Sequence, residues 1–149
     1  MKKFRFFSVA VAVVTALFVS VWAQTTGSYT YNMTTLNGFA PGETSKSCLN
    51  LPGPSASYLY QVIVKGKLSS SCSPATGQIR LYQLNGAQQT LIGSVNVPVS
   101  STTSFSNATI TLPHPKYPAN GSYCIAAYVT GCSGAISLTS GSAVFYWKP

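Results

Sequence analysis

Residues 58–68 of the chain read Tyr58-Leu59-Tyr60-Gln61-Val62-Ile63-Val64-Lys65-Gly66-Lys67-Leu68. The side chains alternate with period two: one face carries Tyr60, Val62, Val64 and Leu68, and the other carries Gln61, Lys65 and Lys67. Alternation of this kind is typical of a β-strand that buries one face. We therefore predict a strand here, with Tyr60 and the residues of its face turned toward a core.

The same alternation recurs on both sides of this strand, in residues 79–84, 91–97, 105–112, 123–129 and 136–147, with a first strand expected within 24–35. Asn85-Gly86 predicts a hairpin turn, because both central positions of such a turn favour a positive φ. Ser140-Gly141-Ser142 predicts a β-bulge in the last strand. No stretch after residue 24 has a helical period, so we predict an all-β fold, an antiparallel β-sandwich of about seven strands.

One segment between the predicted strands stands out by its length. Residues 36–57 are rich in Gly, Pro and Ser and are expected to form a long irregular connection. The first strand precedes this connection and could leave its own sheet to complete that of a neighbouring molecule, but the sequence does not decide whether it is exchanged.

Residues 1–23 have the pattern of a removable secretion signal. A basic start, Met1 to Arg5, is followed by a mostly apolar stretch over residues 6–22 and by small or β-branched residues that suit cleavage before Gln24. The alternative is an uncleaved membrane anchor, because an apolar stretch of 17 residues is just long enough to span a bilayer. We expect cleavage, which leaves residues 24–149 as one secreted β-sandwich domain away from the membrane.

The four cysteines agree with export. They form no Cys-x-x-Cys pair, and the chain has one histidine, so a zinc site is disfavoured and two disulfides are expected. In an up-and-down sandwich, Cys48 and Cys124 lie at one end of the molecule and Cys72 and Cys132 at the other. The predicted pairs are therefore Cys48–Cys124 and Cys72–Cys132.

Residues 119–128, Ala-Asn-Gly-Ser-Tyr-Cys-Ile-Ala-Ala-Tyr, resemble the sixth strand of immunoglobulin-like and fibronectin type III-like domains. There, a small turn precedes an inward Tyr and alternating apolar residues. The resemblance implies a sandwich architecture. It does not extend to the antibody-type core, because residues 58–68 contain no Cys and residues 78–84 contain no Trp.

The composition excludes several classes of active site. The chain has one acidic residue, Glu43, against nine Lys and Arg, and its net charge of +8 falls to +5 once the signal is removed. Carboxylate pairs, calcium cages and Ser-His-Asp triads are therefore excluded. The remaining acid–base candidates, Glu43 and His114, are expected to be loop residues. We predict no catalysis, metal or cofactor. We also predict no nucleic-acid binding, because Lys65 and Lys67 are the only close basic pair after the signal.

Two functions remain open. Low charge, abundant Ser and Thr and a disulfide-bonded β body favour a structural or adhesive surface domain that contacts other copies of itself or cell-surface proteins, as in a filament or surface layer. Tyr146 and Trp147 are the candidate contact surface. Residues 143–147 are apolar on both faces, so one face should pack on the core and the other needs cover from a neighbouring subunit, a ligand or another loop. The alternative is a carbohydrate-binding module that stacks sugars on exposed rings, with candidates Tyr58, Tyr60, Tyr82, Tyr128, Tyr146 and Trp147.

Three Asn-x-Ser/Thr sequons follow the signal, at Asn32, Asn107 and Asn120. They are potential N-glycosylation sites if the host glycosylates its secreted proteins. Because Ser and Thr are frequent in this chain, some sequons are expected by chance.

Overall fold

The computed structural model describes residues 26–149, so the expected signal over residues 1–23 and its cleavage site lie outside the described residues. Within this range the regular secondary structure consists of β-strands, with no helix. The strands are β1 (Gly27–Asn32), β2 (Leu36–Glu43), β3 (Ser47–Asn50), β4 (Tyr58–Ser70), β5 (Thr76–Asn85), β6 (Gln88–Val97), β7 (Phe105–Thr111), β8 (Tyr117–Pro118) and β9 (Ser122–Lys148). The predicted all-β class is confirmed.

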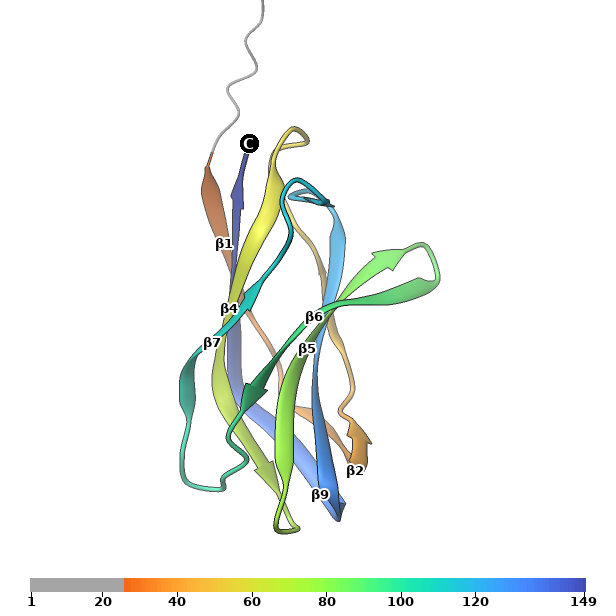
Figure 1. Cartoon of the computed structure of the whole chain (residues 1–149), viewed down its shortest axis with the longest axis vertical. Helices are drawn as coiled ribbons and strands as arrows, with labels where there is room; N and C mark the ends of the chain where they lie inside the picture. The colour runs from red at the N-terminus through yellow and green to blue at the C-terminus, as the bar shows by residue number, and fades with distance from the viewer. Residues whose placement is uncertain (1–25) are drawn as a thin grey trace, which may run out of the picture.

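The strands form one antiparallel sheet organised around β9. The hydrogen-bonded path runs β6-β5-β9-β4-β7, while β1, β2 and β3 pair with β9, and β8 pairs with β4. The 27-residue β9 descends to the lower end of the molecule and returns to the upper end, where the C-terminus lies (Figure 1). Its first half, up to Thr130, pairs with β5, and its second half, from Ile136, pairs with β4. Gly131, at the bend, has a φ of +90°, which a glycine adopts without strain.

The sheet curls until its two outer strands meet. Within the described range β6 pairs with β5 alone and β7 with β4 alone, so no ladder joins β6 to β7. Gly93 of β6 nevertheless lies so close to Ile110 of β7 that a Cβ atom on Gly93 would overlap the isoleucine side chain. The curled sheet therefore encloses a single core between its two halves.

The core is built from side chains that alternate along the strands. Ala108, Ile110 and Leu112 are buried along β7 and the residue after it, as the sequence predicts, and so are Tyr123, Ile125, Ala127 and Val129 in the first half of β9. Full burial of one large aliphatic or aromatic side chain is worth about 1.5–3 kcal/mol. The largest fully buried side chains are those of Tyr123, Phe145, Leu59, Leu68, Ile79, Leu81, Ile125 and Leu138.

The alternation in β4 differs from the prediction at its start. The pairing between β4 and β9 shifts between Leu59 and Gln61, so Tyr60 is an extra residue in a bulge. Leu59 is fully buried in its place, and Tyr60 is half-buried with its ring 6.4 Å from that of Tyr146. The prediction that Tyr60 faces the core was therefore wrong, because the bulge changes the phase of the strand.

The prediction of an irregular connection over residues 36–57 is also wrong, because this segment contains β2 and β3. Both strands pair with β9. Only residues 33–35 separate β1 from β2, and Met33 is 8% exposed and donates its backbone N–H to Gly141 O over 2.9 Å. The first strand therefore has no long flexible connection that would free it for exchange.

Two features of the local backbone were expected from the sequence. The bulge at Ser140-Gly141-Ser142 is confirmed, because the β4–β9 register shifts at this point and Ser140 has a φ of +52°. The β5–β6 hairpin is also present, but Asn85 pairs with Gln88, so the turn residues are Gly86 and Ala87. Gly86 takes the positive φ, +63°, at the first central position.

Both predicted disulfides are present. Cys48–Cys124 joins β3 to β9 with Cα atoms 4.0 Å apart, and Cys72–Cys132 joins the β4–β5 turn to the bend of β9 with Cα atoms 5.7 Å apart. No cysteine is free, a pattern typical of proteins that fold in an oxidising compartment. None of the elements within residues 26–149 is a helix long and apolar enough to cross a membrane.

Candidate functional site

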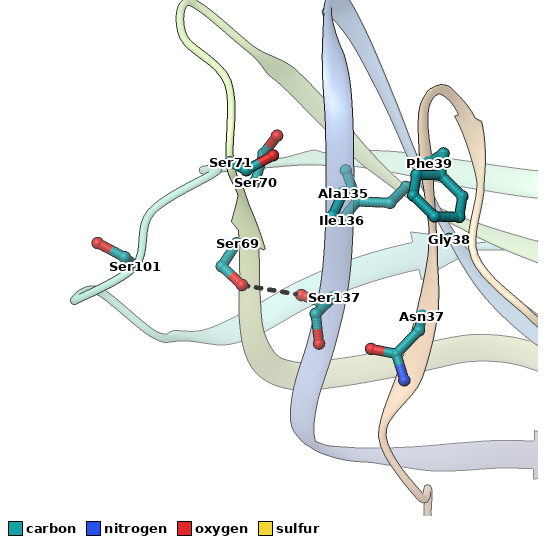
Figure 2. A pocket seen from close by; sticks show the side chains of 10 residues that line it. All are labelled: Asn37, Gly38, Phe39, Ser69, Ser70, Ser71, Ser101, Ala135, Ile136 and Ser137. Atoms are coloured by element: carbon teal, nitrogen blue, oxygen red, sulfur yellow. Dashed lines mark hydrogen bonds between the residues drawn. The ribbon is translucent and has the colours of Figure 1, made fainter.

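A groove of about 520 Å³ crosses the outer face of the sheet where β2, β9 and β4 lie side by side (Figure 2). Residues from each of these strands and from the loop before β7 line it. No lining residue is charged, and five are serines. The lining residues are Asn37, Gly38, Phe39, Ser69, Ser70, Ser71, Ser101, Ala135, Ile136 and Ser137.

Strand register explains the arrangement of the lining. Alternate residues of each strand face the core, as the burial of Leu36, Leu68 and Ile136 shows, and the residues between them face outward. Two rows of outward side chains result across the three strands, namely Asn37–Ser137–Ser69 and Phe39–Ala135–Ser71. Hydroxyl and amide groups therefore lie beside an aromatic ring on one face.

The ring of Phe39 is 75% exposed, more than Leu91 at 47% and Tyr29 at 39%, the other exposed large apolar side chains among residues 26–149. Its neighbour across the strand pair is Ala135, whose side chain is too short to cover it. In Figure 2 the ring stands at one side of the groove, and the serines of β4 lie at the other. An apolar ring beside small polar side chains forms a contact surface open to solvent.

A tight reversal of β2 holds Phe39 in place. Gly38 and Thr44 form an isolated antiparallel bridge, and Ser45 N–H donates to Asn37 O over 2.8 Å. Gly38 is required here, since a Cβ atom would overlap the backbone of Glu43 and Thr44. The reversal carries the chain from the second half of β9 to its first half, so that Glu43 pairs with Tyr128.

The other end of this reversal carries a charged cluster. The carboxylate of Glu43 accepts a hydrogen bond from Arg80 Nη1 over 2.9 Å and one from the hydroxyl of Tyr82, and it lies 3.3 Å from Lys46 Nζ. The guanidinium of Arg80 also stacks 3.5 Å from the centre of the Tyr128 ring. The cluster ties β2, β5 and β9 together.

The hydrogen bonds of the cluster set its protonation. Burial raises the pKa of Glu43, but hydrogen bonds from Tyr82, Arg80 and Lys46 outweigh it and hold the pKa below its ordinary value of 4.5. Burial and the hydrogen bond to Glu43 raise the pKa of Tyr82 above its usual range. Glu43 is therefore a stable anion at neutral pH and forms an ion pair rather than exchanging a proton.

Glu43 and His114 are not brought together. The described partners of Glu43 are those of the cluster, whereas the ring of His114 packs edge-on against Tyr58, with centroids 5.9 Å apart. Glu43 lies in β2 rather than in a loop. Between residues 26 and 149 no three His, Cys, Asp or Glu side chains come close enough to hold a metal.

The six rings considered for sugar stacking do not form one platform. Tyr82 and Tyr128 lie on β5 and the first half of β9, where Lys46 and Arg80 cover their faces. The other four lie on β4 and the second half of β9.

Tyr146 and Trp147, the predicted contact pair, lie on opposite faces of β9. Trp147 is only 8% exposed and belongs to the core, where its indole packs against Gly27. The sequence predicts that one of these two rings packs on the core, and Trp147 is that ring. Tyr146 alone remains as a candidate contact residue of the pair. Tyr146 is half-buried against Tyr60, over whose ring Lys148 Nζ lies at 5.1 Å, so the chain itself supplies much of its cover.

The three sequon asparagines, Asn32, Asn107 and Asn120, are all exposed. Glycosylation at these sites stays a prediction.

Sequence reasoning missed Phe39. It lies within the segment expected to be irregular, and Asn37-Gly38 before it has the composition of a turn. The available signal was the alternation of Leu36, Gly38 and Ala40 with Asn37 and Phe39, which places the only aromatic residue of β2 on the outer face.

Comparison with known proteins finds little similarity. No family model matches the chain, and no curated protein matches it. A chain in the solved "Structure of infectious bursal disease virus Gt strain" is similar with a TM-score of 0.43 and 14% sequence identity. The match covers 80% of this chain and 32% of that one, so this chain spans about a third of the length of its structural neighbour.

Proposed function

We propose that this protein is a secreted, non-catalytic adhesive or structural domain that acts by contact through the groove around Phe39. The observation that carries this proposal is the exposure of Phe39, which is 75% accessible to solvent in a groove whose lining contains no charged residue. A lone exposed apolar side chain is ordinary on a protein surface, so the proposal rests on the position of this ring in the lining of a groove. The partners are cell-surface components or other copies of the chain.

The architecture supports a role of this kind. Two disulfides and a continuous curled sheet give a body that persists outside the cell, and the reversal between Gly38 and Thr44 presents Phe39 on rigid backbone. Backbone that is already ordered by strand pairing loses little further entropy on binding, which favours affinity.

We further propose that the curled sheet is an immunoglobulin-like sandwich, with the two halves of β9 as the sixth and seventh strands. Tyr123 supports this reading. It is fully buried, and its hydroxyl donates to Pro118 O, five residues upstream, over 2.8 Å. A tyrosine that bonds back to the preceding backbone at the start of the sixth strand is a hallmark of such domains. Architecture of this kind supports contact functions and catalysis alike, so the function itself depends on the groove.

The test compares attachment and assembly of the secreted chain with those of Phe39→Ser. We expect Phe39→Ser to remain folded but to be released from producing cells, or to run as a smaller species in size-exclusion chromatography with light scattering. Leu91→Ser is the matched control, because it removes another exposed apolar side chain from a different strand, β6. Equal behaviour of wild type and Phe39→Ser in both assays would overturn the proposal.

A further inference from the structure

The geometry points to a neutral saccharide as the occupant of the groove, with Phe39 as the stacking ring. This inference rests on the proposed function and names the class of partner. It differs from the sugar platform expected from the sequence, which used other rings.

The chemistry of the lining matches a sugar on two sides. The polarised C–H groups of a pyranose face pack on the electron-rich face of an aromatic ring, and the ring of Phe39 is open to receive them. The opposite side of the groove offers hydroxyl groups from Ser71 and Ser101, and Asn37 supplies an amide that both donates and accepts. Sugar hydroxyls need partners of both kinds, and these side chains provide them.

The volume also fits. About 520 Å³ lies within the range of roughly 300–1,000 Å³ that holds small-molecule ligands.

Other occupants fit the groove less well. An anion would need a basic side chain, and none of the lining residues is charged. A peptide that adds as a strand would need free backbone groups. Here β9 lies between β2 and β4, and its ladders with both already use the backbone of the groove floor. Phe39 is the only large exposed apolar side chain in the lining, which is too little for a lipid chain. Recognition here therefore relies on side-chain hydroxyls, an amide and one ring.

The test is an NMR titration of the disulfide-bonded secreted protein, labelled with ¹⁵N. The probes are cellohexaose, laminarihexaose and mannohexaose as neutral oligosaccharides, with hexagalacturonate as an anionic comparison. We expect at least one neutral probe to change the chemical shifts of the Asn37 side-chain amide and of the backbone amides of Ala135 and Ser137. We expect hexagalacturonate to leave these chemical shifts unchanged. Absence of shifts with all three neutral probes, or shifts confined to other strands, would overturn the inference.

Three variants make the test specific. Phe39→Ala should weaken binding of the active probe about tenfold, whereas Phe39→Tyr, which keeps the ring, should stay within about threefold of wild type. Leu91→Ala should bind as wild type. Unchanged binding by Phe39→Ala would contradict the stacking role. If no oligosaccharide binds while Phe39→Ser still loses cell attachment or assembly, the saccharide inference fails and the proposed function stands.

Discussion

Thr44 and Ala127 are joined by two reciprocal hydrogen bonds. The backbone N–H of Thr44 donates to Ala127 O over 2.9 Å, and the backbone N–H of Ala127 donates to Thr44 Oγ1 over 3.0 Å. Both residues are buried. This pair anchors the reversal of β2 to β9, and through Gly38 it fixes the position of Phe39.

The first prediction concerns this anchor. Thr44→Val keeps the shape of the side chain but leaves the buried N–H of Ala127 without its acceptor. We expect the free energy of unfolding to fall by about 1–3 kcal/mol, measured by urea denaturation. Thr90→Val, at an exposed position of β6, is the control and should change stability by less than about 0.5 kcal/mol. A Thr44→Val protein as stable as wild type would show that the hydroxyl does not anchor β2.

The second prediction concerns acid stability. Because the folded chain holds the pKa of Glu43 below 4.5, the unfolded chain binds a proton there first as the pH falls. The stability from Glu43 is therefore fully present well above pH 4.5 and is lost as the pH falls through 4.5 and then through the folded pKa. Glu43→Gln should cost about 1 kcal/mol at pH 7, a modest value because the ion pairs are partly exposed.

Urea midpoints at pH 7 and pH 3 measure this effect. Glu43 is the only side-chain carboxylate of the chain, so the Gln variant should lose much less stability than wild type between the two values. An equal loss in both proteins would contradict the assigned role of the cluster.

The third prediction concerns the disulfide at β3. This strand has four residues, and among residues 26–149 it pairs with β9 alone, so Cys48–Cys124 is a main part of its attachment. The bridge spans 76 residues, and its removal should cost about 4 kcal/mol in the chain-entropy model. In the Cys48→Ser/Cys124→Ser double variant, amide hydrogen exchange should accelerate most over Ser47–Asn50.

The Cys72→Ser/Cys132→Ser double variant is the comparison, because it removes a bridge of similar span, 60 residues, at the bend of β9. It should lose similar stability while β3 keeps its protection. Loss of β3 protection in both variants to the same degree would contradict a local role for Cys48–Cys124.

Much of the fold was predictable because burial of one strand face imposes period two on the sequence. The inward residues of β7 and of the first half of β9 follow that period. The bulge at Ser140-Gly141-Ser142 interrupts the period and was predictable from a glycine between two small polar residues within a strand. The cysteine pairs could be assigned because they require only the order of the strands and the ends at which the connections lie.

Two of the errors arise from irregularities of the backbone within paired strands. A one-residue bulge at Tyr60 changes which side chains of β4 face the core, and the bulge between Ala40 and Gly42 lets β2 cross from one half of β9 to the other. These two bulges depend on tertiary pairing, and the alternation of the local sequence did not reveal them. Phe39 was missed because its segment was expected to be irregular. The degree of its exposure also depends on the short side chain of Ala135, about a hundred residues away in sequence.

The fourth prediction separates the two terminal aromatic residues. Trp147→Ser should lower the free energy of unfolding by about 3–5 kcal/mol, because it empties a core site against Gly27. Tyr146→Ser removes a half-buried ring that packs on Tyr60 and should cost about 1 kcal/mol. Chemical denaturation of both variants measures the difference, and the reverse order of effects would contradict the register of β9.

The fifth prediction tests the central claim, that the protein acts through the groove at Phe39. The measurement is photo-crosslinking on producing cells, with a benzophenone side chain placed at position 39 or, as a control, at position 91. Both positions are exposed, so both variants should fold and be secreted equally. We predict a covalent adduct to a cell-surface component or to a second copy of the chain from position 39, and none from position 91. Adducts of equal yield from both positions, or an adduct from position 91 alone, would contradict the account.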